Sequence, residues 1–292
     1  MKICRFNQDR LGLIEGDKVF DVTRALAVIP GGGWPAPKGD PLFIHFDAVR
    51  RAIVEARPSA GAFNVADVTM NNLFTAPTKI MAAPANYAAH AAEASQEGIS
   101  HGAHAHIAKM ERPVDKLGIF LKANSSAVGP DDGVALKFPD RRNDHEVELC
   151  CVIGKGGRDI PRARAFEHIA GYFIGLDMTV RGAEDRSWRK SLDTYTVFGP
   201  MVTADDVKDP ENMTIWITVN GEHRQKTSTS KLTVGIPELI ELCSSGYELF
   251  PGDVLMTGTP EGVGPVQPGD VMKAGGDGLG EFSVKVRAYK PG

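Results

Sequence analysis

The sequence predicts an α+β fold that is rich in β-strands. Its 32 glycines and 19 prolines are spread along the chain and separate short strand-like runs. Asn220-Gly221, which lies between two such runs, is typical of a tight β-hairpin turn. With 42% hydrophobic and 24% charged residues the composition is that of a globular protein, and the 292 residues allow one large domain or two smaller ones.

Residues 1–76 are predicted to form a small N-terminal module. Gly16-Asp17 joins two strand-like runs as a hairpin, and apolar residues at helical spacing follow a loose segment rich in Gly and Pro. Three strands and one helix are expected in the module: 1–6, 11–15, 18–22 and 44–56.

Residues 77–292 are predicted to form a larger second domain. Its expected strands are 79–82, 117–122, 134–138, 145–154, 174–179, 213–219, 222–226, 253–257, 270–274 and 281–287. Helical spacing of apolar or helix-permissive residues predicts helices over 84–97, 166–173 and 236–243.

Charge and cysteine content exclude several classes of partner. The 33 Lys+Arg and 37 Asp+Glu give a formal net charge of −4, whereas nucleic-acid binding needs a concentrated basic surface. No stretch approaches the roughly 20 apolar residues of a membrane span, and residues 1–10 are too polar for a signal peptide. The four cysteines lack metal-site spacing, so reduced core thiols in a cytoplasmic protein are expected.

Three carboxylates stand where the expected strands are apolar. Glu146 and Glu148 are two residues apart on one strand and therefore project from the same face. Spacing alone also allows an exposed strand face, but solvation does not explain Asp177, which ends the apolar run 172–176. Three carboxylates on strands make a hard oxygen site that suits Mg²⁺, Mn²⁺ or Ca²⁺.

His90 and Glu93 form a second candidate constellation. Residues i and i+3 of a helix share a face, so Glu93 can orient His90. A histidine held in this way beside a metal ion is a natural general base for water. An ordinary His–Glu pair on the surface, without a chemical role, is the alternative reading of this spacing.

Several short motifs follow one another in the order of one family. They are Asn-Tyr-x-x-His-x-x-Glu at 86–93, Asp-His-Glu-Val-Glu-Leu at 144–149, Gly-Tyr at 171–172, Asp-Met-Thr-x-Arg at 177–181, Lys-Ser-x-Asp-Thr at 190–194, Gly-Pro at 199–200, Val-Asn-Gly at 219–221, Pro-Gly-Asp at 251–253 and Thr-Gly-Thr-Pro-x-Gly-Val-Gly at 257–264. Together they resemble the fumarylacetoacetate hydrolase family, in its fumarylacetoacetate hydrolase domain-containing branch. The resemblance runs from about Lys79 to the C-terminus.

The resemblance implies a β-sandwich roll that usually dimerises and acts on a 2-oxo acid. It implies that Mg²⁺ or Mn²⁺, with Ca²⁺ also considered, is held by the three carboxylates, and that a lid helix carries the His90–Glu93 dyad. It further implies that Lys190 donates a proton or stabilises charge. Its implied substrate-binding residues are Tyr87, Arg181, Glu184 and Thr259.

The expected activity is hydrolysis of a C–C bond in a 1,3-dioxo acid of the acylpyruvate or fumarylacetoacetate type. The metal would stabilise the leaving enolate, and the dyad would activate the attacking water. Decarboxylation of a 2-oxo acid such as oxaloacetate, isomerisation of a 2-hydroxy-dienedioate or tautomerisation on the same metal site is the alternative. A metal-stabilised binding protein without catalysis is a third possibility.

Two features depart from the family pattern. Glu184 stands where the family usually has Gln, which replaces an amide donor with an acceptor and places the substrate's polar contacts in question. The segment after Glu93 is long and contains His101, His104 and His106. We expect it to be a mobile polar lid over residues 93–116 rather than a second metal site.

Overall fold

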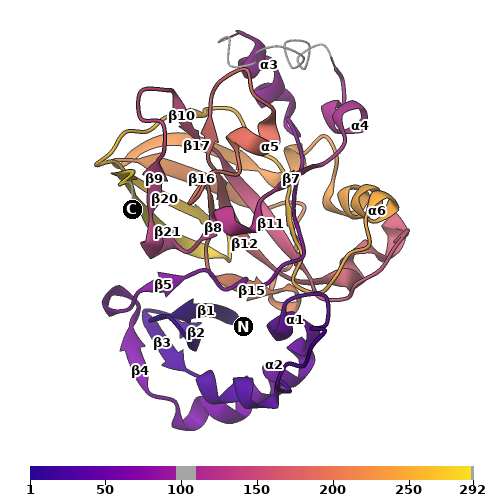
Figure 1. Cartoon of the computed structure of the whole chain (residues 1–292), viewed down its shortest axis with the longest axis vertical. Helices are drawn as coiled ribbons and strands as arrows, with labels where there is room; N and C mark the ends of the chain where they lie inside the picture. The colour runs from indigo at the N-terminus through magenta and orange to yellow at the C-terminus, as the bar shows by residue number, and fades with distance from the viewer. Residues whose placement is uncertain (97–109, 291–292) are drawn as a thin grey trace.

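The N-terminal module is a small antiparallel sheet covered by helices (Figure 1). The computed structural model describes residues 1–96 and 110–290. The strands of this module are β1 (Lys2–Phe6), β2 (Arg10–Glu15), β3 (Lys18–Asp21), β4 (Ala62–Asn64) and β5 (Met70–Asn71), and its α-helices are α1 (Pro41–Ile44) and α2 (Phe46–Ala56).

The module's sheet continues into the rest of the molecule because β1 pairs with β15. The main path of this sheet runs β4-β3-β2-β1-β15-β12-β11-β18-β6-β7, with β5, β8 and β14 off the path. The strands beyond the module are β6 (Ile80–Ala82), β7 (Phe120–Lys122), β8 (Ala127–Val128), β11 (Val147–Ile153), β12 (Ile169–Asp177), β14 (Thr196–Phe198), β15 (Met201–Thr203) and β18 (Val254–Met256).

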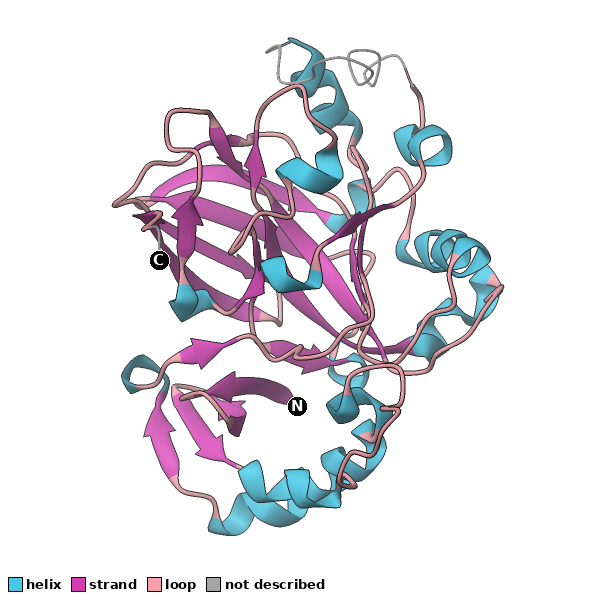
Figure 2. Ribbon diagram, in the orientation of Figure 1, coloured by secondary structure: helices cyan, strands magenta, loops and turns pink. Residues whose placement is uncertain are grey.

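Among the described residues, two smaller sheets and four α-helices complete the larger part (Figure 2). One sheet has the order β17-β16-β20-β21-β9 and the other has the order β13-β10-β19. Their bounds are β9 (Val134–Leu136), β10 (Asn143–His145), β13 (Thr179–Val180), β16 (Thr214–Val219), β17 (Glu222–Ser228), β19 (Gly264–Pro265), β20 (Val271–Gly276) and β21 (Gly280–Ala288). The helices are α3 (Ala88–Gln96), α4 (Pro113–Leu117), α5 (Arg186–Arg189) and α6 (Ile236–Gly246).

β11 and β12 are buried on both faces because two cores meet at them. One core joins them to the five-stranded sheet and to α6, and the other joins them to α2 and the N-terminal module. The neighbouring Cys151 and Cys150 point into the first and the second core, respectively. A strand with two dry faces shows no polar alternation, so any carboxylate it carries needs a partner within the protein.

The α+β, strand-rich fold class is confirmed, whereas two local predictions are wrong. Residues 166–173 are not a helix, because a 3₁₀ helix at Arg162–His168 gives way to β12 at Ile169. The strand expected over 117–122 begins only at Phe120, because α4 extends to Leu117 and Gly118, at φ +67°, ends that helix. The division into two parts between residues 76 and 77 stays a prediction.

Among the described residues, no helix is long and apolar enough to cross a membrane.

Candidate metal and active site

Two paired strands bring the three predicted carboxylates together. Glu146 directly precedes β11, Glu148 lies within it, and Asp177 ends β12, which pairs with β11 in antiparallel register. The Asp177 amide donates to the Glu146 carbonyl at 2.8 Å. One potential ligand atom from each side chain lies within 4.8 Å of the others. All three residues are at most 3% exposed, so these strands do not present an exposed acidic face.

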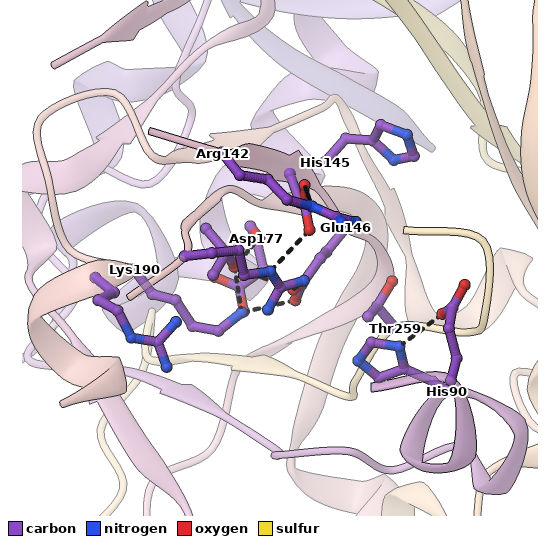
Figure 3. A network of polar contacts seen from close by, with 12 residues as sticks. His90, Arg142, His145, Glu146, Asp177, Lys190 and Thr259 are labelled. Carbon is purple, nitrogen blue, oxygen red and sulfur yellow. Dashed lines mark hydrogen bonds and ion pairs between the residues drawn. The ribbon is translucent and has the colours of Figure 1, made fainter. Parts of the chain in front are cut away.

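Lys190 forms ion pairs with two of the three carboxylates. The short helix α5, capped by Asp185, ends just before it. The Lys190 ammonium donates to Glu146 Oε2 and Asp177 Oδ2, both at 2.6 Å, and to Thr179 Oγ1 at 2.7 Å (Figure 3). All three N–H donors of Lys190 are thus used within the site.

Two further cations complete this buried network. Arg181 donates to Asp144 Oδ2 at 2.7 Å and to Glu146 Oε1 at 2.9 Å, so its guanidinium joins two carboxylates. The Lys122 ammonium contacts Asp177 Oδ1 and also donates to the Lys190 carbonyl at 2.5 Å. Buried charges persist in proteins when they are paired in this way.

Glu148 is the carboxylate that the network leaves uncompensated. Its Oε2 accepts from the Gly258 amide at 2.7 Å, and no described Lys or Arg forms an ion pair with it. Burial and then the nearby Asp177 raise the pKa of Glu148 well above its usual range. Burial also opposes ionisation of Glu146, but Lys190 and Arg181 outweigh it and hold the pKa of Glu146 below its usual range.

This donor set fits a divalent cation. Every candidate ligand atom is a carboxylate oxygen, which hard cations such as Mg²⁺ and Mn²⁺ prefer. A cation at the triad would supply the positive charge that Glu148 lacks. The assignment of Glu146, Glu148 and Asp177 as metal ligands therefore has a physical basis in the structure, and it stays a prediction.

The His90–Glu93 dyad forms on α3. His90 Nδ1 lies 3.3 Å from Glu93 Oε2, and the Gly262 amide donates to Glu93 Oε1 at 2.9 Å. His90 is 7% exposed, so the pair is not a solvated surface pair. One loop joins the dyad to the carboxylates, because its Gly258 amide donates to Glu148 and its Gly262 amide donates to Glu93. In Figure 3, His90 and Thr259 lie at one end of the network and Lys190 at the other.

The predicted substrate-binding residues are placed differently from one another. Tyr87 is 1% exposed, and its hydroxyl has no partner among the described residues. Burial and then the charge of Glu148 raise the pKa of Tyr87. Thr259 donates its hydroxyl proton to the Val147 carbonyl at 2.9 Å, so this hydroxyl has an acceptor position left but no free donor.

The other two substrate-binding candidates are already engaged in ion pairs. Arg181 is held by carboxylates as described above. Glu184 lies outside the carboxylate network, where its side chain forms an ion pair with Arg141 at 2.8 Å and stays partly exposed. Substrate binding by these residues and by Tyr87 and Thr259 stays a prediction. The possible second metal site at His101, His104 and His106, and most of the expected lid, lie outside the described residues.

Sequence reasoning missed three residues that shape the site. Lys122 ends a short strand, where a lysine is usually solvated, and only the fold shows that it is buried against Asp177. Gly258 and Gly262 supply amides to Glu148 and Glu93. Their φ angles of +106° and +90° favour glycine, so the glycines of the 257–264 motif were a signal for a specific loop shape.

Comparison with known proteins identifies the family. The profile of the fumarylacetoacetate (FAA) hydrolase C-terminal domain matches residues 79–287. The chain belongs to the fumarylacetoacetate hydrolase family. It is 49% identical over 290 residues to a maleylpyruvate hydrolase from Aquipseudomonas alcaligenes, an alignment that covers 99% of this chain and 100% of that one.

Other members of the fumarylacetoacetate hydrolase family extend the comparison. The crystal structure of maleylpyruvate hydrolase from Sphingobium sp. SYK-6 in complex with manganese(II) and pyruvate has a TM-score of 0.82 and 36% identity, with coverage of 99% of this chain and 100% of that one. A mitochondrial oxaloacetate tautomerase from Arabidopsis thaliana is 38% identical over 231 residues, which are 76% of this chain and 97% of that one. The predictions of the family and of a hydrolase that acts on C–C bonds are confirmed.

Proposed function

We propose that this protein hydrolyses the C–C bond between C3 and C4 of an acylpyruvate, a 2,4-dioxo acid of the maleylpyruvate type, to pyruvate and a carboxylic acid. The observation that carries the proposal is the buried carboxylate triad with the His90–Glu93 dyad in the same site. The similarity to maleylpyruvate hydrolases over nearly the whole chain supports the same substrate class.

We propose a divalent cation at Glu146, Glu148 and Asp177, with Mg²⁺ or Mn²⁺ as the physiological ion and Ca²⁺ as a third candidate. When bound, it supplies a Lewis acid for the 2-oxo acid and for the negative charge that develops as the C–C bond breaks. The manganese and pyruvate of the related maleylpyruvate hydrolase support this choice.

His90 is the general base of the proposed reaction. Glu93 accepts a hydrogen bond from the Nδ1–H group of His90, which leaves the lone pair of Nε2 free to take a proton from water. The water oxygen adds to the C4 carbonyl, the C3–C4 bond breaks with its electron pair on C3, and a proton then returns to C3. Burial raises the pKa of Glu93, but the hydrogen bond with His90 lowers it, and the pKa is lowered overall. Glu93 therefore stays a hydrogen-bond acceptor.

Lys190, Arg181 and Tyr87 bind the substrate and stabilise its negative charge in the proposed reaction. Lys190 and Arg181 keep Glu146 ionised. We propose that their positive charges also stabilise the negative charge that develops in the substrate. The buried Tyr87 hydroxyl has no partner among the described residues, so a substrate oxygen can accept from it without displacing one of them. We propose these three residues as the substrate-binding and charge-stabilising group.

Tautomerisation or decarboxylation of oxaloacetate is the second candidate. The similarity to the oxaloacetate tautomerase favours it, because keto–enol exchange needs the same metal and cations but no attacking water. The hydrolase needs the dyad to activate water and consumes an acylpyruvate. The second candidate needs no attacking water and consumes oxaloacetate.

A substrate panel separates these functions. The purified protein, freed of metal and reloaded with Mg²⁺ or Mn²⁺, is assayed with maleylpyruvate, fumarylpyruvate and oxaloacetate. Our proposal predicts pyruvate and an organic acid from an acylpyruvate, at a rate that exceeds the turnover of oxaloacetate. Turnover of oxaloacetate alone would replace the hydrolase proposal with the second candidate, and no turnover of any 2-oxo acid would favour a binding protein.

Homodimerisation and a cytoplasmic location stay proposals. The family resemblance implies the dimer, which size-exclusion chromatography with light scattering tests. The four buried, unpaired cysteines support a reducing compartment.

A further inference from the structure

Gln225 of β17 ties the metal site to a loop through one buried side chain. It is 1% exposed, and its Oε1 accepts from the Val147 amide at 3.0 Å and from His145 Nδ1 at 3.1 Å. Its Nε2 donates to Thr259 Oγ1 at 2.9 Å and to the Pro260 carbonyl at 2.8 Å. The Val147 amide can only donate and the Pro260 carbonyl can only accept, so chemistry fixes the orientation of this amide.

The two ends of the loop 257–264 serve different halves of the active site. At the first end, the Gly258 amide bonds Glu148, and Thr257 is held to the Leu149 carbonyl by its hydroxyl at 2.9 Å. At the other end, the Gly262 amide bonds Glu93 of the dyad. The loop therefore links a proposed metal ligand to the partner of the proposed general base.

Gln225 acts mainly on the dyad end of this loop. The metal end is attached to β11 by the hydroxyls of Thr257 and Thr259, whereas the Pro260 carbonyl, halfway to Gly262, is held by Gln225. Gly262 itself lies so close to β17 that a Cβ at this position would collide with the Arg224 carbonyl oxygen. The strand that carries Gln225 is thus the surface on which the dyad end of the loop lies.

We propose that Gln225 is a positioning residue for the proposed hydrolysis. By holding the loop 257–264, it sets the position of the His90–Glu93 dyad relative to the metal-binding carboxylates. The inference rests on the proposed function for its kinetic consequence, although its structural part can be tested without turnover. A general base must stand within hydrogen-bonding reach of the attacking water, and a displacement of about 1 Å can cost on the order of 10²-fold in rate.

The test compares two substitutions at Gln225 with a matched control. Gln225→Met keeps the side-chain volume and removes all four hydrogen bonds, whereas Gln225→Glu keeps the acceptor for Val147 and removes both donors. Thr227→Val is the control, because Thr227 lies on the same buried face of β17 and its hydroxyl has no partner among the described residues. Gln225→Glu carries the test if Gln225→Met does not fold.

Amide exchange of the metal-free protein tests the structural part. We expect the Gly262 amide to exchange at least about 10-fold faster in the Gln225 variants, while the Gly258 amide stays within about 3-fold of the wild type. Thr227→Val should change neither amide. Unchanged protection of Gly262 would overturn the inference, whatever the protein's activity proves to be.

A double-mutant cycle tests the link to the dyad. In the Mn²⁺-loaded enzyme, Gln225→Met should lower kcat for an acylpyruvate by about 10- to 100-fold. The Kd for Mn²⁺ and the KM should stay within about 3-fold of the wild type. In a Glu93→Ala background, Gln225→Met should lower kcat by less than about 3-fold relative to Glu93→Ala alone, because the dyad is already disabled. Additive losses would overturn the role of Gln225 through the dyad, whereas absence of turnover in the wild type would overturn the proposed function alone.

Discussion

Two equally buried carboxylates, Asp253 and Glu148, differ in how their charge is satisfied. Asp253 is 0% exposed, and its oxygens accept from the amides of Thr78, Lys79 and Phe250 at 2.8–3.0 Å and from the Lys79 ammonium at 2.5 Å. Glu148 is 2% exposed and accepts from the Gly258 amide, with two carboxylates beside it. Asp253 is saturated by donors of the protein itself.

The difference distinguishes a structural carboxylate from a binding carboxylate. Asp253 ties the segment before β6 to the turn before β18, and further positive charge would gain little there. At Glu148, burial and the like charge of Asp177 oppose ionisation. A cation that binds there would stabilise the ionised carboxylate. We therefore expect substitutions at the triad to change metal binding and substitutions at Asp253 to change stability.

The largest effect should come from Asp177→Ala. The substitution removes one proposed ligand and leaves the buried Lys122 and Lys190 without their shared carboxylate. Metal-dependent hydrolysis should fall below detection, and the rise in Tm that Mn²⁺ gives the wild-type protein should disappear. Steady-state assays and thermal melts with and without Mn²⁺ measure both. Wild-type turnover in this variant would remove Asp177 from the site.

His90→Ala should lower hydrolysis of an acylpyruvate by roughly 10²- to 10⁴-fold, the usual scale for loss of a general base. Because His90 is not a proposed ligand, the Kd for Mn²⁺ should stay close to that of the wild type. A variant with full hydrolase activity would show that the dyad takes no part in the reaction.

Glu148→Gln should separate metal binding from stability. The substitution removes the uncompensated charge but keeps an oxygen that can accept from the Gly258 amide, so the metal-free protein should melt at a higher temperature than the wild type. The affinity for Mn²⁺ should fall. Thermal melts in chelator and calorimetric titrations test the two halves, and a lower Tm without metal would contradict our account of Glu148.

The smallest effect on activity should come from Asp253→Asn. The new amide nitrogen cannot accept from the amides that Asp253 now binds, which should cost about 1–3 kcal/mol of unfolding free energy. Denaturant unfolding measures this loss. Activity and Mn²⁺ affinity measured well below the Tm should be those of the wild type, and weakened metal binding would undermine the contrast with Glu148.

The sequence showed the carboxylates of the site better than the strands that carry them. Glu146, Glu148 and Asp177 were recognisable because carboxylates in apolar runs need an explanation. Strand β12 was misread as partly helical because its two faces are both dry, so its apolar residues carry no period of two. Burial on both sides depends on which sheets and helices cover the strand, and a single sequence does not contain that information.

The cations of the site show the same limit. Lys190 and Arg181 were found through family motifs. Lys122 had no local signal, because its burial depends on contacts with residues that lie at least 55 positions away in the sequence. Glu184 was expected near the substrate from its alignment with a family Gln, but its pairing with Arg141 depends on how the loop after β13 folds.

Direct titration of Mn²⁺ into the metal-free protein tests the central claim. Calorimetry should show one Mn²⁺ site per chain in the wild type and an equal site in Asp253→Asn, whereas Asp177→Ala should have lost it. Equal Mn²⁺ affinity in the wild type and Asp177→Ala would contradict the claim that these buried carboxylates form the metal site.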